Sequence, residues 1–421
     1  MHKRIVRSDG SVVILTTRHE SQSVTWEIIF KVGSRQERKS INGVSHFIEH
    51  LMFKGTKKRP DTQVLSRELD SVGAEYNAFT GKDHTGYYIQ TDAKNIKLGV
   101  DMLSDMLHHA KFDPVEMERE RSVIVEELNM YRDNPAMRID EIFETLLFKG
   151  SPLGWEIGGP RRVIRSLSHK DLLAFKNRFY YPGNMVIGLA GKFSETQALK
   201  LIDRYFPVKK KKDKAAIKKV ALAQDKPRIM IERKKTDQIQ LMLGFPGFSY
   251  NHKDAHTLMV LSVIMGGTMS SRLFIQIRER KGLAYRVRAM SESFEDTGYF
   301  AVQAGLDKQR IYEALEAIKD ELVLVKKKGV TGEELRRAKD NIRGRLILKF
   351  ERPSAYLSYL MSQEILTNRI DDLEKMLSKI ERVKLKDVKR VAQRIISWKK
   401  SNLALIGPFT DKKKFLTIVQ S

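Results

Sequence analysis

Two histidines and a glutamate stand at helical spacing early in the 421-residue chain. On an α-helix successive residues rotate by about 100°, so Glu49 and His50 lie about 60° and 40° to either side of His46. Two imidazoles one turn apart can chelate one small divalent cation, and Glu49 then lies beside an open coordination position. The pattern predicts a metal that activates water, with Glu49 removing the water proton and passing it to a leaving group.

Zinc is the expected ion, because neutral imidazole and carboxylate ligands suit it and a catalytic zinc needs only three protein ligands. Manganese or cobalt is the alternative. The chain contains no cysteine, so thiolate metal sites, disulfides and cysteine nucleophiles are excluded. The competing interpretation of the motif is a pair of helical histidines that pack or meet solvent. With ten histidines in the chain, a chance match has odds on the order of a few in a hundred.

A third ligand is expected from the helix predicted over Pro114–Tyr131. Glu116, Glu120 and Glu127 are separated by four and seven residues, so their side chains lie within roughly 40° of one another on a helix. Glu116 is explained by the helix dipole and by solvation, and Glu126 points about 100° away from Glu127. We therefore expect Glu127 to bind the metal and Glu120 to orient a ligating histidine or the metal-bound water.

This combination of residues resembles a known family. The order His46-x-x-Glu49-His50, with Glu120 and Glu127 downstream, is similar to the inverted zincin motif of the pitrilysin-type metallopeptidases. That family includes insulin-degrading enzyme, the mitochondrial processing peptidase and short bacterial peptidases, and this chain resembles the short bacterial type along nearly its whole length. The resemblance implies a zinc metalloendopeptidase with one zinc per chain, acting on peptides or unfolded segments inside a chamber.

The resemblance also implies substrate-binding residues in both halves of the chain. Asn77, Ala78 and Phe79 match the edge strand on which an extended peptide pairs through its backbone. Arg278 and Tyr285 match an arginine and a tyrosine that hold the substrate backbone near the zinc, where both side chains can donate to an oxyanion. Without the resemblance, the segment at Asn77, Ala78 and Phe79 could equally be an interior strand. Arg278 would then be interpreted as a solvated residue on a helix.

The order of predicted elements favours an α+β fold with two similar domains, each a mixed β-sheet covered by helices and related by internal duplication. We expect a catalytic zinc-binding domain at 1–208, a Lys-rich linker at 209–226 and a substrate-contacting domain at 227–421. Strands are predicted at Ser11–Thr16, Val24–Phe30, Glu75–Thr91 (a pair), Asn184–Ala190, Arg228–Arg233, Ile239–Pro246, Tyr285–Ser291, Tyr299–Ala304 and Leu403–Ile406.

Composition and charge bear on three other classes of protein: nucleic-acid-binding, membrane and secreted proteins. The formal net charge of +25 suggests nucleic-acid binding, but the densest basic run, Lys209–Lys219, lies between two apolar regions and is typical of a solvated linker. No apolar segment is long enough to cross a membrane, and no secretory signal precedes the first predicted strand. We therefore expect a cytoplasmic protein that binds neither nucleic acid nor membrane.

The expected partners are a peptide substrate and a second subunit. The resemblance implies that a chain of this length is half of an enclosure, completed by a homodimer or by a heterodimer with a related inactive subunit. The alternative function is a non-catalytic assembly or scaffold protein that retains a structural metal site. Structural zinc sites normally close with four protein ligands, whereas three ligands and a free glutamate favour catalysis.

Overall fold

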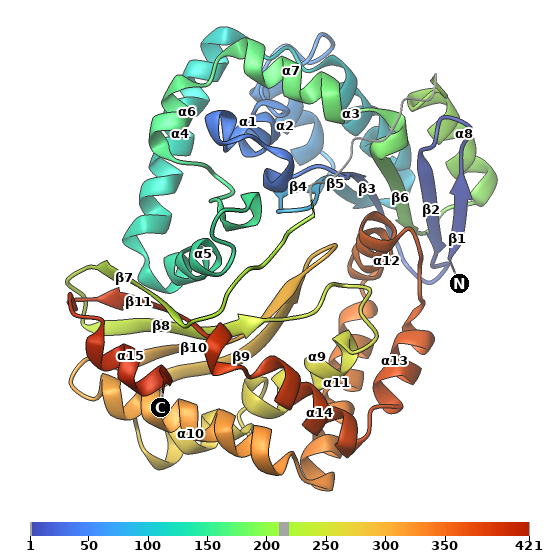
Figure 1. Ribbon diagram of the computed structural model, residues 1–421. Coiled ribbons are helices and arrows are strands. Elements are labelled where there is room, and N and C mark those ends of the chain that lie inside the picture. Colours follow the sequence, from blue (N-terminus) through green and yellow to red (C-terminus); the bar gives the residue numbers. More distant parts are fainter. Residues whose placement is uncertain (1, 210–218, 421) are drawn as a thin grey trace. The chain divides into compact units, whose positions relative to one another are not determined.

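The computed structural model describes residues 2–209 and 219–420, which form two compact units (Figure 1). Unit 1 comprises Met1–Leu128, Trp155–Lys218 and Ile347–Asp371, and unit 2 comprises Asn129–Gly154, Lys219–Leu346 and Asp372–Ser421. Most of the predicted Lys-rich linker, at 210–218, lies outside the described residues. Among the helices that the structure describes, none combines the length and the apolar composition needed to span a lipid bilayer.

Unit 1 contains a six-stranded mixed sheet in the order β1-β2-β6-β3-β5-β4. The strands are β1 (Lys3–Val6), β2 (Val12–Thr17), β3 (Ser23–Phe30), β4 (Glu75–Thr80), β5 (Thr85–Asp92) and β6 (Met185–Gly191). Only β2 and β6 pair in parallel, and the other neighbours are antiparallel. In the sheet as described, β4 pairs with β5 alone and therefore forms an edge.

Helices cover both faces of the unit 1 sheet. On one face, the buried side chains of β3 contribute to a core with α1 (Val44–Leu51) and α3 (Ile96–His109). On the other face lies α12 (Pro353–Thr367), whose Ser358 hydroxyl donates a 2.8 Å hydrogen bond to the buried carboxylate of Glu27. The remaining helices of this part of the chain are α2 (Thr62–Asp70), α4 (Pro114–Asp133), α6 (Arg161–Ser166), α7 (His169–Phe179) and α8 (Glu195–Tyr205).

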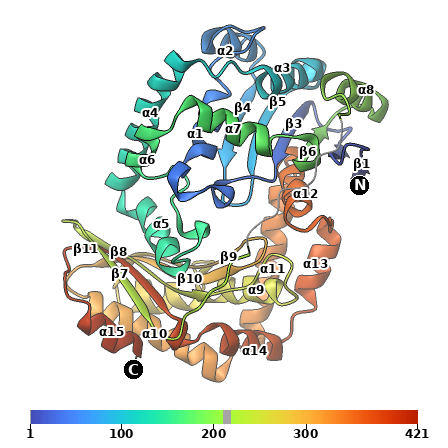
Figure 2. The ribbon, with the colours of Figure 1, turned by 45° about the horizontal axis from the view of Figure 1, so that its top comes forward.

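Unit 2 contains a five-stranded mixed sheet in the order β7-β11-β8-β10-β9. The strands are β7 (Arg228–Arg233), β8 (Gln238–Pro246), β9 (Ala284–Ser293), β10 (Gly298–Asp307) and β11 (Asn402–Gly407). One face is covered by α5 (Pro135–Leu147) and the other by α9 (Ala255–Gly266) and α10 (Ile311–Lys328) (Figure 2). The later helices are α11 (Gly332–Phe350), α13 (Leu373–Glu381), α14 (Leu385–Ile395) and α15 (Lys413–Gln420).

The two sheets share one topology. The order β2-β6-β3-β5-β4 in unit 1 corresponds strand for strand to β7-β11-β8-β10-β9 in unit 2. In each sheet the first of these pairs is parallel and the other three are antiparallel. The prediction of two similar α+β domains with mixed sheets is confirmed, and the shared strand order is what an internal duplication leaves behind.

The expected domain bounds, 1–208 and 227–421, stay a prediction. The two units exchange two segments between the halves of the chain. Unit 2 includes α5 from the first half of the chain, and unit 1 includes α12 from the second half. Each helix packs over a sheet glycine: a Cβ atom at Gly244 would lie 2.6 Å from the Phe143 ring, and one at Gly188 would lie 2.2 Å from the Met361 sulfur. The sequence analysis did not predict α5, whose apolar residues meet a sheet that begins more than eighty residues later.

A buried arginine joins α2 to α3 in unit 1. The Arg59 side chain is 2 % exposed and forms ion pairs of 2.7 Å with Glu68, 2.7 Å with Asp101 and 2.9 Å with Asp105. The hydroxyl of Thr56 also donates to Asp105, at 2.6 Å. One guanidinium therefore pairs with three carboxylates, of which that of Asp105 is buried.

Replacing Arg59 with glutamine should destabilise the protein by about 3–5 kcal/mol, because it leaves the buried carboxylate of Asp105 without its guanidinium partner. Urea unfolding followed by circular dichroism measures this loss. Arg67→Gln is the matched control, since Arg67 is exposed on α2 and its side chain bonds only a local carbonyl. Equal stability of the two variants would contradict the expectation.

Candidate active site

The helix that carries the histidine motif is anchored at its N-terminus by a buried glutamate. Helix α1 starts after Gly43, whose φ of 98° places it in the left-handed region that glycine tolerates and whose missing side chain provides no cap. Glu37 supplies the cap instead, accepting hydrogen bonds from the backbone N–H groups of Gly43, at 2.7 Å, and Ser45, at 2.8 Å. Burial raises the pKa of Glu37 to about 7, against the opposing effect of these hydrogen bonds.

The inward face of α1 packs in the core and leaves the polar residues of the motif on the opposite side. The buried residues of α1 are Val44, Ser45, Phe47, Ile48 and Leu51, all 0 % exposed. His46 and His50 remain partly accessible, and their rings meet edge to face with centroids 4.7 Å apart. Core packing on one side of a single helical turn therefore presents both imidazoles together on the other.

Helix α4 brings a carboxylate to the two imidazoles. Oε2 of Glu127 lies 3.3 Å from Nε2 of His50 and 3.6 Å from Nε2 of His46. One donor atom from each of the three residues lies within 4.8 Å of the other two, and no second such group of metal-binding side chains occurs in residues 2–209 and 219–420. Zinc bonds of about 2.0–2.2 Å in a tetrahedral site place the donor atoms about 3.3 Å apart. These three side chains fit a zinc ion.

Glu120 contacts His50 on the ring nitrogen that faces away from Glu127. Its Oε2 lies 3.0 Å from Nδ1 of His50, and its Oε1 lies 2.5 Å from the ammonium group of Lys54. Burial opposes ionisation of Glu120, but the hydrogen bonds from His50 and Lys54 prevail and lower the pKa of its carboxyl group. The ionised carboxylate accepts the Nδ1 proton, so the proton that His50 must release to bind a metal is the one on Nε2, which faces Glu127.

The two imidazoles have opposite proton affinities in the metal-free protein. Burial and the neighbouring charge of His50 lower the pKa of His46 to about 4. Burial also acts to lower the pKa of His50, but hydrogen bonds to Glu120 and Glu127 overcome it and raise this pKa to about 9. Near neutral pH, His46 is therefore ready to bind a metal, whereas His50 must first lose a proton.

Glu49 lies beside these ligands and is held by a different element. The hydroxyl of Thr80, the last residue of β4, donates a hydrogen bond to its Oε2. Burial raises the pKa of Glu49, and the Thr80 hydrogen bond partly offsets this effect. A carboxylate whose pKa is shifted towards neutrality, with one oxygen held in place, is suited to accept and return a proton.

The predicted substrate strand is an edge strand that ends at the site. Asn77, Ala78 and Phe79 lie on β4, which pairs with β5 alone. The backbone N–H of Ala78 donates to the side-chain oxygen of Asn77, at 2.8 Å. The Phe79 ring covers Gly86 of β5, where a Cβ atom would lie 2.3 Å from it. The edge strand thus packs closely on β5, and one of its N–H groups is occupied by the side chain of the preceding residue.

Arg278 and Tyr285 lie together in unit 2. Arg278 belongs to a π-helical segment, η6 (Phe274–Arg280), rather than to the ordinary helix expected there, and Tyr285 is near the start of edge strand β9. The Arg278 guanidinium lies 5.5 Å from the centre of the Tyr285 ring and 4.8 Å from that of Phe274. Tyr285 is 75 % exposed, so its hydroxyl is accessible to a ligand.

Three residues that hold the site in place were not predicted from the sequence: Glu37, Lys54 and Thr80. Lys54 follows His50 by four residues, and this spacing was a usable signal. Glu37 and Thr80 act across loops of the fold, at Ser45 and Glu49, and no sequence periodicity relates them to the residues they bind.

Comparisons with known proteins point to one family. Residues 12–161 match the family described as Insulinase (Peptidase family M16), and residues 166–342 match the Peptidase M16 inactive domain. The chain is 31 % identical to "Uncharacterized zinc protease YmxG" of Bacillus subtilis, over 97 % of this chain and 98 % of that protein.

Solved structures share the whole fold. A protease from Helicobacter pylori superposes with a TM-score of 0.89 at 24 % identity, covering 97 % of this chain and 99 % of the other. A chain of complex III2 from Candida albicans superposes with a TM-score of 0.86 at 18 % identity, covering 99 % of each. The named relatives and the family match support a zinc-dependent peptidase.

Zinc affinity should rise about tenfold per pH unit up to roughly pH 9 and then level off, because zinc must displace the proton on His50. Glu120→Gln removes a carboxylate that raises this pKa, so the plateau should begin at lower pH and the plateau affinity should fall about 10–100-fold. Competition with a chelator of known affinity measures both. Glu116→Gln, on the same helix, is the control and should match the parent protein; a pH-independent affinity in the parent would contradict the assignment.

Proposed function

Because the chain belongs to the insulinase family of peptidases, peptidase family M16, we propose that it is a zinc metalloendopeptidase acting on peptides or unfolded segments. The observation that carries the proposal is the convergence of His46, His50 and Glu127 within 4.8 Å, with Glu49 beside them. Three ligands and a separate carboxylate favour a catalytic site over a structural one, which closes with four protein ligands. We propose one zinc ion per chain.

We assign separate chemical roles to the residues around the proposed metal. When bound, zinc lowers the pKa of a coordinated water and polarises the scissile carbonyl group. Glu49 takes the water proton through the carboxylate oxygen that Thr80 leaves free, and later returns it to the leaving amine. Glu120 keeps His50 in the tautomer that can bind metal and retains a negative charge through Lys54.

The open edge of β4 is the proposed binding strand for the peptide backbone. An edge strand offers unpaired N–H and C=O groups to an extended chain without selecting strongly among side chains. In the free protein the side chain of Asn77 occupies the N–H of Ala78. A substrate carbonyl would replace that side chain, which could then bond the peptide itself. Because β4 ends at Thr80, the bonded partner of Glu49, a peptide on this edge passes next to the catalytic carboxylate.

Arg278 and Tyr285, from unit 2, are the proposed contacts to the substrate backbone. The guanidinium and the exposed phenol hydroxyl are both donors, and their contact limits the conformations that each adopts. Donors fixed in advance stabilise the oxyanion of a tetrahedral intermediate more effectively than mobile ones. The second half of the chain matches a domain described as inactive, which is consistent with substrate contact rather than metal binding in that half.

A second subunit is also proposed, either another copy of the chain or a related inactive chain. The fold shared with a chain of complex III2 supports assembly with other subunits. Light scattering of the purified chain separates the two cases, because only the homodimer forms without a partner. The alternative function is a non-catalytic assembly protein with a structural metal, and it predicts zinc binding without hydrolysis.

Glu49→Gln should retain zinc and lose about 10²–10⁴-fold in turnover, because the amide cannot accept the water proton. Cleavage of a mixed peptide pool, read by mass spectrometry with and without a zinc chelator, gives the activity, and elemental analysis gives the zinc content. Glu116→Gln should cleave as the parent protein does. Substantial cleavage by the Glu49 variant would refute the assigned role, and absence of chelator-sensitive cleavage by the parent would favour the scaffold function.

Tyr285→Phe should lower kcat by about 10²–10³-fold, the effect of removing one donor to an oxyanion, with a smaller change in KM. Steady-state kinetics on a peptide identified from the pool measure both constants. Tyr312→Phe is the matched control, since Tyr312 also lies in unit 2 but packs its ring against Phe409 and Phe415. A change confined to KM would instead assign Tyr285 to ground-state binding.

A further inference from the structure

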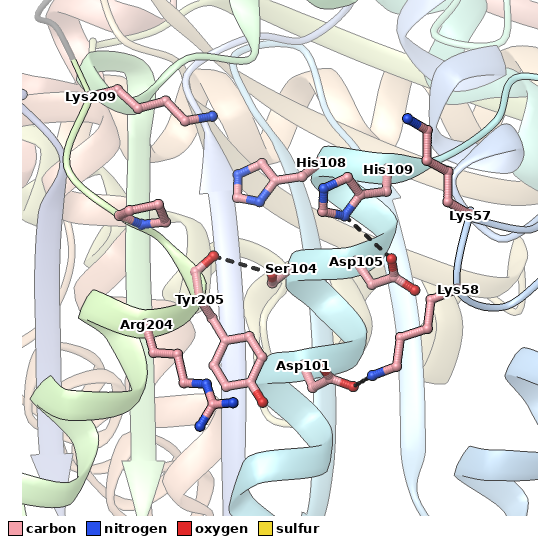
Figure 3. Close-up of a pocket in the computed structure, with 11 residues that line it drawn as sticks. Lys57, Lys58, Asp101, Ser104, Asp105, His108, His109, Arg204, Tyr205 and Lys209 are labelled. Carbon is pink, nitrogen blue, oxygen red and sulfur yellow. Dashed lines mark hydrogen bonds and ion pairs between the residues drawn. The ribbon is translucent and has the colours of Figure 1, made fainter.

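A second cavity in unit 1 lies apart from the metal-binding side chains. It has a volume of about 670 Å³ and opens between the C-terminal half of α3, the end of α8 with the segment that follows it, and the loop at Lys57 and Lys58 (Figure 3). This volume is within the range of about 300–1,000 Å³ that small-molecule sites occupy. None of its lining residues belongs to the group formed by His46, Glu49, His50 and Glu127.

The acidic groups of this cavity already have partners. Asp101 is paired with Arg59 at 2.7 Å and with Lys58 at 2.5 Å. Asp105 is paired with Arg59 at 2.9 Å and lies 3.4 Å from Nδ1 of His109. Because these carboxylates are compensated from within the protein, they contribute little free negative charge to the cavity.

Three other basic groups of the cavity lack such partners among the described residues. Lys57, Lys209 and Arg204 line it, and none forms an ion pair among the residues that the structure describes. In Figure 3, Lys209, His108, His109 and Lys57 follow one another across one side of the cavity. The two lysines therefore leave unbalanced positive charge around the two imidazoles.

The effect of that charge is visible in neighbouring groups. Desolvation and the positive charge of Lys209 lower the pKa of His108, and the same two causes lower the pKa of Lys176. These basic groups are thus close enough to disfavour one another's protonation. An anion bound here would relieve this repulsion.

Part of the cavity lining is apolar. Tyr205 and Pro207 line it, and the Arg204 guanidinium lies 5.7 Å from the centre of the Tyr205 ring. A cavity of this size is larger than an inorganic anion requires. An organic group attached to the anion would lie against these two side chains.

We propose that this cavity binds a small phosphorylated organic molecule, with its phosphate at Lys57, Lys209 and His109 and its organic part against Tyr205 and Pro207. A phosphate monoester carries between one and two negative charges near neutral pH, because its second pKa is about 6. It therefore balances the two unpaired lysines, which bind phosphate as point charges. His109 adds a ring nitrogen whose orientation is set by the contact of its other nitrogen with Asp105.

Isothermal titration of the full chain with phenyl phosphate at low ionic strength tests the proposal. Phenyl phosphate should bind more tightly than inorganic phosphate, because only the ester contacts Tyr205. The double variant Lys57→Gln/Lys209→Gln should weaken phenyl phosphate binding by at least about tenfold, since each lost charged contact is worth that much or more. Neither step requires zinc or peptidase activity.

The matched control is Lys399→Gln/Lys400→Gln, which removes the same formal charge from exposed positions in unit 2. It should bind phenyl phosphate as the parent does, and thermal unfolding verifies that both double variants fold. An equal loss in both double variants would show a response to the overall charge and would overturn the proposal. Absence of binding by the parent, or equal affinity for inorganic and phenyl phosphate, would also overturn it.

Discussion

Three donor atoms from two helices must meet at the spacing that one metal ion requires. Glu127 approaches His50 at 3.3 Å and His46 at 3.6 Å, and buried charges contact both helices, α1 and α4, that carry these residues. Glu37 holds the start of α1 through its first N–H groups. Glu120 ties α4 to His50 and, through Lys54, to the loop after α1. The same contacts that dock the helices also set the proton affinity of the ligands.

The exchanged helices explain how one chain builds two similar units. In each unit a helix from the other half of the sequence packs on a sheet glycine, Gly188 under α12 and Gly244 under α5. A side chain at either glycine would hold the helix away from its sheet. Neither half of the chain contains all of its own unit, so the halves depend on each other for folding as well as for the proposed catalysis.

Different functions are proposed for corresponding strands of the two units. The edge strand β4 ends at Thr80 beside Glu49, the proposed general base, and its counterpart β9 carries Tyr285 near its start. One ancestral edge thus provides the proposed peptide backbone contacts in unit 1 and a proposed oxyanion donor in unit 2. In unit 1 the short loop after α1 contacts two helices. Lys54 contacts Glu120 of α4, and Thr56 and Arg59 contact Asp105 of α3.

The sequence by itself determined what lies within one regular element. His46, Glu49 and His50 share a helical turn, and Glu120 and Glu127 share a helix face, so the period of 3.6 residues relates them without further information. Strand order, the exchange of α5 and α12, and the partners Glu37 and Thr80 were decided by the tertiary structure. These contacts join residues whose separation along the chain follows no period, and they form only when packing of the sheets brings distant segments together.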